Sequence, residues 1–229
     1  MSTEPLLGLL QFADGLFPAG GHAHSFGLEA CVQDGRVRSR AELQAFVEAL
    51  LEGSAGPCDA AAVAAASRSA ARRDIASALD LDARLEAMKP AVELREASRQ
   101  MGRQTLRAAV ALLDEASLAG LWEAVEAGRT PGHHALVFGF VGQAVGSAPE
   151  AAAAAYLYST AAMVVGAALR LLPLGQVEGQ RTLWALRPLL ARLAAEAAGK
   201  GADDLWSFTP GIEIAAMRHA RLPARLFRS

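Results

Sequence analysis

Apolar residues recur at the spacing of an amphipathic helix along most of this chain. In one clear case, Leu43, Phe46 and Val47 fall on a single helical face. The residues just before them, 39–42, read Ser-Arg-Ala-Glu, a capping box in which the serine hydroxyl and the glutamate carboxylate satisfy free backbone N–H groups. Gly53 then ends the pattern. These signals predict a helix from about residue 40 to residue 52.

Similar signals predict about nine or ten helices in the whole chain. Asp59 is the expected N-cap of an alanine-rich helix, and a second capping box over residues 147–150 is expected to open a long apolar helix that Pro173 ends. Pro188 predicts a kink near Trp184 in the helix that contains both residues. The expected helices lie at about residues 5–12, after 25, 40–52, 59–79, 90–113, 117–127, 133–145, 147–172, 176–198 and 210–219.

Glycines at 139, 142 and 146 lie inside or at the end of one of these expected helices. A helical glycine costs about 0.8–1 kcal/mol relative to alanine. Three of them so close together therefore predict close backbone approach by a neighbouring helix. This glycine face at 139–146 and the small residues 161–168 are also candidate contacts between two copies of the chain.

The stretch from Ala151 to Leu169 carries no charged residue and is about long enough to cross a bilayer. Its consecutive alanines are a weak insertion signal, and Tyr156, Tyr158 and Thr160 add polar groups. We therefore favour a buried core helix. A membrane-associated protein built on this segment is the alternative, and separation of soluble from membrane material would decide between the two.

Composition narrows the fold class to all-α. The 229 residues are 52% hydrophobic but only 6% aromatic, and alanine supplies much of the apolar content. Isoleucine occurs only as Ile75, Ile212 and Ile214, so the β-branched and aromatic runs that sheets and barrels need are missing. We expect a single-domain helical bundle over residues 1–229. Its expected parts include an N-terminal segment and glycine-rich turn at 1–24 and a C-terminal tail at 221–229.

Charge and cysteine content exclude several classes of function. The 22 lysines and arginines nearly balance 24 aspartates and glutamates, which gives a net charge of −2, whereas a nucleic-acid-binding protein needs a basic excess. Cys31 and Cys58 have neither CxxC spacing nor a disulfide-rich context. Residues 1–11 lack the basic start of a signal peptide. A reduced, cytoplasmic protein is therefore expected.

The motifs of common catalytic sites are missing. No nucleophile elbow, Walker loop, HExxH or Rossmann fingerprint occurs, so we do not expect an enzyme or a tightly bound cofactor. The candidate metal ligands are His22 and His24, together with His133 and His134. Imidazole pairs can bind Ni²⁺ or Zn²⁺, but neither pair has the i, i+4 spacing that places two ligands on one helical face. These histidines also fit loop or cap positions, so a transient nickel contact at His22 and His24 is a hypothesis.

Arginines form a ribbon on one expected helix. Arg95, Arg99, Arg103 and Arg107 recur every four residues and therefore lie along one face. This ribbon is either a solvated face with local ion pairs, for example to Glu93, or a docking stripe for an acidic partner.

The C-terminus carries no acidic side chain after Glu213. Four arginines remain there, with Leu226 and Phe227 among them. A disordered solubilising tail has little use for a Leu-Phe pair beside arginine, a residue type that is over-represented at interface hot spots. We expect the tail to bind a partner or to fold back on its own domain, and it can do both.

Four blocks of the sequence resemble the urease accessory protein UreF family, in the family's order. The first, residues 6–37, reads LLGLLQFADGLFPAGGHAHSFGLEACVQDGRV, and the second, 93–103, reads ELREASRQMGR. The third, 172–180, is LPLGQVEGQ. The fourth, 210–229, is PGIEIAAMRHARLPARLFRS and ends in the family's RLFRS. Together the blocks span nearly the whole chain.

The resemblance implies an all-α, cytoplasmic, usually dimeric protein that is not itself an enzyme. Proteins of this family bind the accessory protein UreD, called UreH in some species. That complex recruits the nickel-carrying GTPase UreG and docks on the urease apoprotein, into which nickel is inserted. The family has been proposed to activate or to gate the GTPase. The alternative function is a GTPase-activating protein that donates a catalytic arginine from the ribbon.

Carried over residue by residue, the resemblance assigns partner binding to the C-terminal block and to two central blocks. The residues are Arg218, His219, Arg225, Leu226, Phe227, Arg228 and Ser229 for UreD/UreH, and Glu93, Arg95, Arg99, Gln100, Gln176, Gly179 and Gln180 for the partner or GTPase face. The tail departs from the family pattern at residues 220–224, where a carboxylate, an amide and a tyrosine are lost and Pro223 is gained. The contacts of that stretch are therefore not carried over.

Overall fold

The computed structural model describes residues 3–228, and within that range the chain forms helices and loops without a β-strand. Eleven α-helices occur there. The π-helical segment η2 joins α3 to α4 without a break, so counting these as one helix gives ten. The all-α class and the predicted number of helices are confirmed. The elements are α1 Thr3–Ala13, η1 Gly21–Ala23, α2 Leu28–Gln33, α3 Arg40–Leu50, η2 Leu51–Ala60, α4 Ala61–Ala71, α5 Ile75–Ala87, α6 Val92–Leu112, α7 Ala116–Glu126, α8 His134–Ala144, α9 Pro149–Leu171, α10 Gln176–Ala198, η3 Ala202–Asp204 and α11 Pro210–His219.

Several predicted boundaries agree with the structure. Helix α10 spans the predicted range. The capping box before α3 is formed: the backbone N–H of Glu42 donates to the Ser39 hydroxyl at 3.3 Å, and the Glu42 carboxylate accepts from the backbone N–H of Arg38 at 2.7 Å. Local sequence predicts this cap correctly because all of its groups lie within about one helical turn.

Two predicted caps and one predicted helix end are wrong. Gly53 does not end a helix, because it lies within η2, which continues α3 without a break. Asp59 does not begin a helix but lies inside the continuous helix of α3, η2 and α4, where its carboxylate pairs with Lys89 Nζ at 2.7 Å. A tertiary partner thus takes the side chain that local reasoning assigned to the backbone. The second capping box is also absent, because the hydroxyl of Ser147 donates to the carbonyl of Ala148, the residue that N-caps α9. The helix predicted over 59–79 is split by a turn between α4 and α5.

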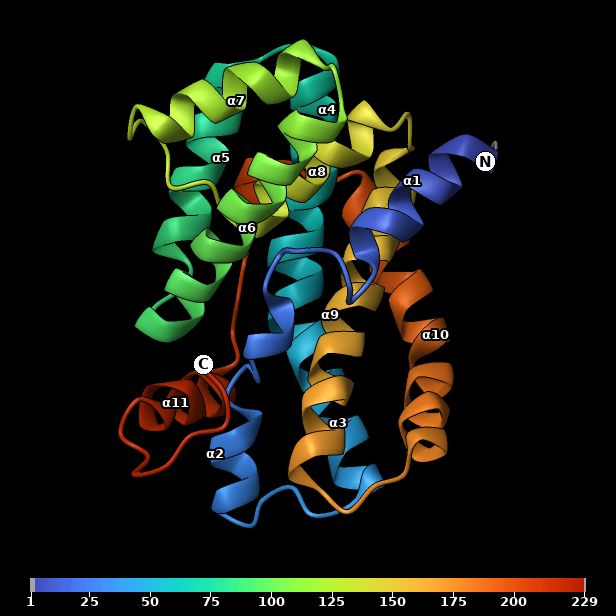
Figure 1. Cartoon of the computed structure of the whole chain (residues 1–229), viewed down its shortest axis with the longest axis vertical. Helices are drawn as coiled ribbons and strands as arrows, with labels where there is room; N and C mark the ends of the chain where they lie inside the picture. The colour runs from blue at the N-terminus through green and yellow to red at the C-terminus, as the bar shows by residue number, and fades with distance from the viewer. Residues whose placement is uncertain (1–2, 229) are drawn as a thin grey trace.

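Helix α9 runs through the middle of the molecule, between the α10 side and the rest of the bundle (Figure 1). Among the described helices it alone is long and apolar enough to cross a membrane, and 56% of its apolar window is buried inside the fold. Leu157, Val164 and Ala168 on its inner face are fully buried. The interpretation as a core helix is confirmed. Most of residues 161–168 is buried within the chain as well, with Gly166 as the one exposed position of this segment, and its role as a dimer contact stays a prediction.

Helix α8 approaches α4 and α9 so closely that only glycine fits at two contacts. A Cβ atom on Gly139 would stand 2.4 Å from the carbonyl oxygen of Val63, and one on Gly142 would stand 2.7 Å from the Cβ of Ala152. The predicted close approach is confirmed. The glycine face at 139–146 is wrong as a dimer contact, because the chain's own helices occupy it.

The C-terminal part of the chain returns to its N-terminal part. Helix α11 packs on α2 and α6, and in Figure 1 the red C-terminal tail lies beside the blue α2. Hydrogen bonds join residues about two hundred positions apart at this place, for example Phe227 to Glu29 and Arg228 to Ala23. The fold thereby brings the first, second and fourth sequence blocks together.

Candidate functional site: the docked C-terminal tail

The tail after α11 is held against the body of the protein by a buried carboxylate. Glu29 of α2 is 3% exposed. Its two oxygens accept hydrogen bonds from the backbone N–H groups of Leu226 and Phe227 at 2.8 and 3.1 Å. The next residue, Arg228, donates its backbone N–H to the carbonyl of Ala23 at 2.8 Å. Three successive tail residues are therefore fixed to the N-terminal region.

A histidine links this carboxylate to a second one. His219, at the end of α11, is fully buried. Its Nε2 lies 2.8 Å from Glu29 Oε2, and its Nδ1 lies 2.9 Å from Glu93 Oε2. Glu93 also pairs with the guanidinium of Arg225 at 2.9 Å. The four side chains form a connected polar network across α2, α6, α11 and the tail.

Apolar contacts complete the attachment. Phe227 is 4% exposed and belongs to the hydrophobic core. The guanidinium of Arg170 lies over its ring, with Cζ 4.2 Å from the ring centre, and the same side chain donates to the carbonyl of His22 at 2.7 Å. Arg170 therefore joins α9, the turn at η1 and the tail. The expectation that the tail folds back on its own domain is confirmed.

The hydrogen bonds decide the charge state of Glu29. Burial alone would raise the pKa of this carboxyl group. The backbone N–H groups of Leu226 and Phe227 and the imidazole of His219 together outweigh burial, so the pKa is lowered from its ordinary value. The docked tail thus stabilises the ionised carboxylate, and the carboxylate in turn holds the tail.

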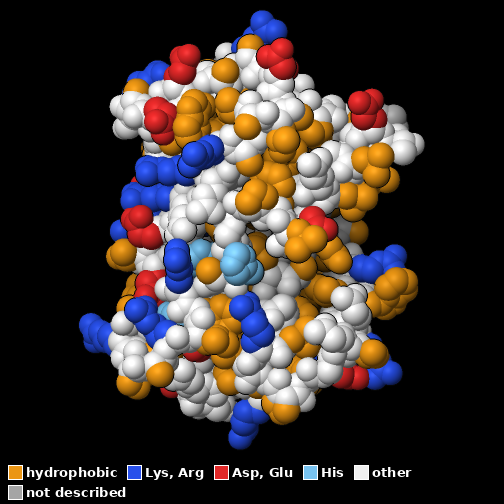
Figure 2. All heavy atoms as spheres, viewed as in Figure 1, with side chains coloured by type: hydrophobic (Ala, Val, Ile, Leu, Met, Phe, Trp, Pro, Cys, Tyr) orange, Lys and Arg blue, Asp and Glu red, His pale blue; other side chains and the backbone are white. Residues whose placement is uncertain are grey.

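The outer side of α11 and the tail carries arginines and apolar side chains. Arg218 lies 3.5 Å from Asp34, and Leu226 is 58% exposed. We call the following set the C-terminal surface: Ile214, Met217, Arg218, Arg221, Arg225, Leu226 and Arg228, all exposed. Figure 2 shows blue basic and orange apolar side chains intermingled over this lower-left part of the molecule. Ser229, also predicted for partner binding, lies outside the described residues.

The arginine ribbon divides into two halves. Arg95 Nε and Arg99 Nε lie 3.3 and 2.9 Å from the Glu86 carboxylate, which His133 also contacts at 2.9 Å. Burial by itself would raise the pKa of Glu86, but Arg99 and His133 lower it overall. The local ion pairs predicted for the ribbon are confirmed only at Arg99, which pairs with Glu96 on the same helix. Glu86, the carboxylate that holds both Arg95 and Arg99, lies on α5, and Glu93 pairs with Arg225 of the tail and not with the ribbon. In the other half, Arg103 is exposed and donates to a loop carbonyl, and Arg107 is exposed.

The third block lies apart from the tail. Gln176 and Gln180 are exposed on the first turns of α10, and Gln100 is half-buried on α6. Gly179 faces inward, where a Cβ would stand 3.2 Å from the side chain of Val165. Figure 1 places α10 and α11 on opposite sides of the molecule. The structure therefore does not bring this predicted partner face together with the C-terminal surface.

The histidines proposed as metal ligands have different environments. His22 is exposed and His24 is buried, and burial, with help from Arg228 and His22, lowers the pKa of His24 to about 4. His133 contacts the Ser98 hydroxyl at 3.0 Å. Burial lowers the pKa of His134 to about 4. Within residues 3–228, no three or more His, Cys, Asp and Glu side chains form a group that could hold a metal ion. Nickel contact at His22 and His24 stays a prediction.

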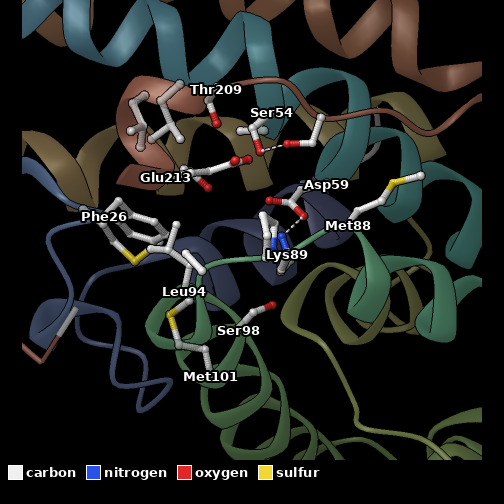
Figure 3. Close-up of a pocket in the computed structure, with 18 of the residues that line it drawn as sticks. Phe26, Ser54, Asp59, Met88, Lys89, Leu94, Ser98, Met101, Thr209 and Glu213 are labelled. Atoms are coloured by element: carbon white, nitrogen blue, oxygen red, sulfur yellow. Dashed lines mark hydrogen bonds and ion pairs between the residues drawn. The ribbon is translucent and has the colours of Figure 1, made fainter. Parts of the chain in front are cut away.

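An internal cavity of about 50 Å³ lies near the tail's attachment, between η2, α6, α9 and α11. Figure 3 shows the ion pair of Asp59 and Lys89 in its wall, with Met101 and Glu213 also lining it. Burial would lower the pKa of Lys89, but Asp59 outweighs burial and raises it. Sequence reasoning missed this ion pair, because nothing in either local sequence indicates a partner 30 residues away. The cavity has room for small species such as water.

Comparison with known proteins gives a consistent result. A model of the UreF family matches residues 37–187. The urease accessory protein UreF of Paenarthrobacter aurescens is 33% identical, with 100% of both chains covered. Those of Trichodesmium erythraeum and Actinobacillus pleuropneumoniae serotype 3 are 32% and 34% identical, over 96% of this chain and 95% and 97% of theirs.

Proposed function

Because this chain belongs to the UreF family of urease accessory proteins, we propose that it is a non-catalytic chaperone for nickel insertion into urease. In this proposal it works in the cytoplasm, as a homodimer built from a single domain, and nickel passes through the complex as cargo. It binds UreD/UreH through its C-terminal surface and recruits and regulates the GTPase UreG on the urease apoprotein.

The observation that carries the proposal is the docked tail. Four exposed arginines and the exposed side chains of Leu226, Ile214 and Met217 form one surface. Glu29 holds its backbone, and Glu93 holds the side chain of Arg225. A surface ordered before binding loses less conformational entropy when a partner docks. Arginine with exposed apolar neighbours fits an acidic partner surface that has an apolar centre. The inward side chains of His219 and Phe227 then act by holding this surface in shape.

The test changes exposed side chains and leaves the anchors in place. The double variant Leu226→Asp, Arg228→Glu should abolish co-purification with the UreD-like partner, while helical circular dichroism stays intact. Leu16→Asp is a matched control, because this leucine is 93% exposed and lies outside the C-terminal surface. Deletion of residues 225–229 should have the same effect as the double variant. Retained complex formation in both would defeat the assignment of this surface.

A second candidate function is activation of the GTPase by a donated arginine. It is supported by Arg103 and Arg107, which are exposed and have no carboxylate partner among the described residues. Arg95 and Arg99 are held by Glu86 and suit this role less well. If Arg103 or Arg107 is the donated residue, its change to alanine should lower stimulated GTP turnover by about 10³-fold or more. Unchanged turnover in both variants would reject the arginine mechanism and leave the binding function standing.

A further inference from the structure

Helix α10 exposes a tryptophan that the fold does not use. Trp184 is 71% exposed, although indole is among the most costly side chains to leave in water. The guanidinium of Arg187 stacks on it, with Cζ 3.9 Å from the ring centre. We define the α10 face as Arg40 of α3 together with Val177, Gln180, Arg181, Trp184 and Arg187 of α10. The stacking holds both long side chains in one arrangement before any partner arrives.

The α10 face is positively charged. Its arginines Arg40 and Arg181 share a single carboxylate, that of Glu178, which lies 3.1 Å from Arg40 Nε. Arg187 has no carboxylate partner among residues 3–228. Farther along the same helix, Arg192 is fully paired, since it contacts both Glu52 and Glu196. In a chain of net charge −2, this leaves a local excess of two positive charges beside the exposed indole.

These features have the composition of an interface hot spot. Tryptophan and arginine are the residue types most enriched among side chains that dominate binding energy. In Figure 2, orange apolar and blue basic side chains adjoin at the right edge, where α10 lies in Figure 1. The exposed Val177, 64% accessible, adds apolar area one turn before Arg181. Exposed alanines at 185 and 191 leave the surroundings of the indole open to a partner.

We infer that the α10 face is a second docking surface, which binds an acidic surface of another protein by inserting Trp184 into an apolar pocket and setting Arg187 against carboxylates. The inference rests on the proposed function, since the partner is a component of the urease maturation assembly other than the one held by the C-terminal surface. A second copy of this chain does not fit, because two α10 faces brought together would oppose arginine to arginine. The positions of α10 and α11 on opposite sides allow both partners to be held at once.

The experiment measures the affinity of the full-length chain for each separately purified partner, the UreD-like protein, the GTPase and the urease apoprotein, by biolayer interferometry. Trp184→Ala should weaken binding to the GTPase or to the urease apoprotein by about 30-fold or more, the loss typical of a hot spot, and should leave binding to the UreD-like protein unchanged. Arg187→Glu should weaken the same interaction, and its effect should shrink at high salt. Both residues are exposed, so thermal unfolding should be unchanged.

Two matched variants serve as controls. Trp206→Ala removes a tryptophan that is 53% exposed outside the α10 face, and Arg192→Ala removes an ion-paired arginine of the same helix. Affinities within about twofold of wild type for both the GTPase and the urease apoprotein, in both Trp184→Ala and Arg187→Glu, would overturn the inference. A loss confined to self-association of the chain would also overturn it. Failure of the proposed function is distinguishable, because it appears as unaltered binding in the Leu226→Asp, Arg228→Glu variant.

Discussion

Replacing Glu29 with alanine is expected to release the C-terminal tail while the rest of the fold persists. The carboxylate is 3% exposed and accepts from the N–H groups of Leu226 at 2.8 Å and Phe227 at 3.1 Å, and it contacts His219 Nε2 at 2.8 Å. Alanine leaves all three groups without an acceptor at a site that excludes most water. The tail can satisfy its backbone groups again only by moving into solvent.

The magnitude follows from the number and kind of these contacts. A hydrogen bond to a charged group contributes about 1.5–3 kcal/mol, and contributions within one network are not additive. Leaving a buried donor without its acceptor costs about 1–3 kcal/mol per group, so for the three groups that Glu29 serves we take about 3–5 kcal/mol as the loss in tail docking. Because about 1.4 kcal/mol corresponds to a factor of ten, the population of the released tail should rise about 10²- to 10⁴-fold.

Native-state hydrogen exchange measures this population directly. The amides of Leu226, Phe227 and Arg228 should lose protection by that factor in Glu29→Ala, and by less in Glu29→Gln, whose side-chain oxygen still accepts. Glu196→Gln is the control, because Glu196 forms an exposed ion pair with Arg192 at 2.9 Å. Such a pair contributes about 0–1 kcal/mol and does not touch the tail.

Two results would refute the reasoning. Unchanged exchange at the three tail amides would show that Glu29 does not hold the tail. An equal loss of protection at the buried amides of α8 would show that the carboxylate supports the whole fold and not the tail alone. Exchange that rises only in the tail, in the order Glu29→Ala above Glu29→Gln, is the expected pattern.

Three further predictions concern pH, packing and the buried ion pair. The pKa of Glu29 is lowered in the folded state, so its contribution to tail docking is fully present above the ordinary glutamate pKa and is lost as pH falls through the lowered value. Hydrogen exchange of the tail amides, measured at decreasing pH, should therefore show the tail being released. Gly139→Ala should destabilise the protein by about 1–3 kcal/mol or more in urea unfolding, because its Cβ would stand 2.4 Å from a backbone oxygen of α4. Gly166→Ala, where a Cβ meets nothing within 4 Å, should stabilise by about 0.5–1 kcal/mol, and equal effects at the two positions would contradict the packing argument. Asp59→Asn should lower the free energy of unfolding by about 3–5 kcal/mol in the same assay, because it leaves Lys89 unpaired. The double variant Asp59→Leu, Lys89→Met should recover much of that loss. An Asp59→Asn variant as stable as wild type would contradict this reasoning.

Local sequence was a reliable guide wherever cause and effect lie within a few residues. The cap of α3 depends on Ser39 and Glu42, three positions apart, and the bounds of α10 follow from its own apolar period. The close approach at Gly139 could also be predicted, because glycine destabilises a helix interior and a close backbone contact is the main reason for one to occur there. The cap expected at Asp59 failed because Asp59 lies inside a longer helix and its carboxylate pairs with Lys89 of the loop between α5 and α6.

The candidate site shows the limit of this reasoning. Sequence identified Arg225, Leu226 and Phe227 as unusual for a tail, and it left open whether they bind a partner or the chain itself. The anchor Glu29 belongs to the first block, and no local signal connects it to residues almost two hundred positions away. The ribbon arginines could not be sorted into paired and free members until the position of Glu86 was known.

The sequence by itself determined that this protein is a helical bundle of the UreF type with a basic tail, because periodicity, caps and the family blocks each depend on residues close together in the chain. Only the tertiary structure decided which of its charged side chains face solvent and which are paired with each other inside the fold. Glu29, Glu93 and His219 meet because α2, α6 and α11 pack together, while Trp184 and Arg187 stay exposed because no element within residues 3–228 covers that side of α10. Charge pairing depends on distances of a few ångströms between segments far apart in the chain, and packing alone sets those distances.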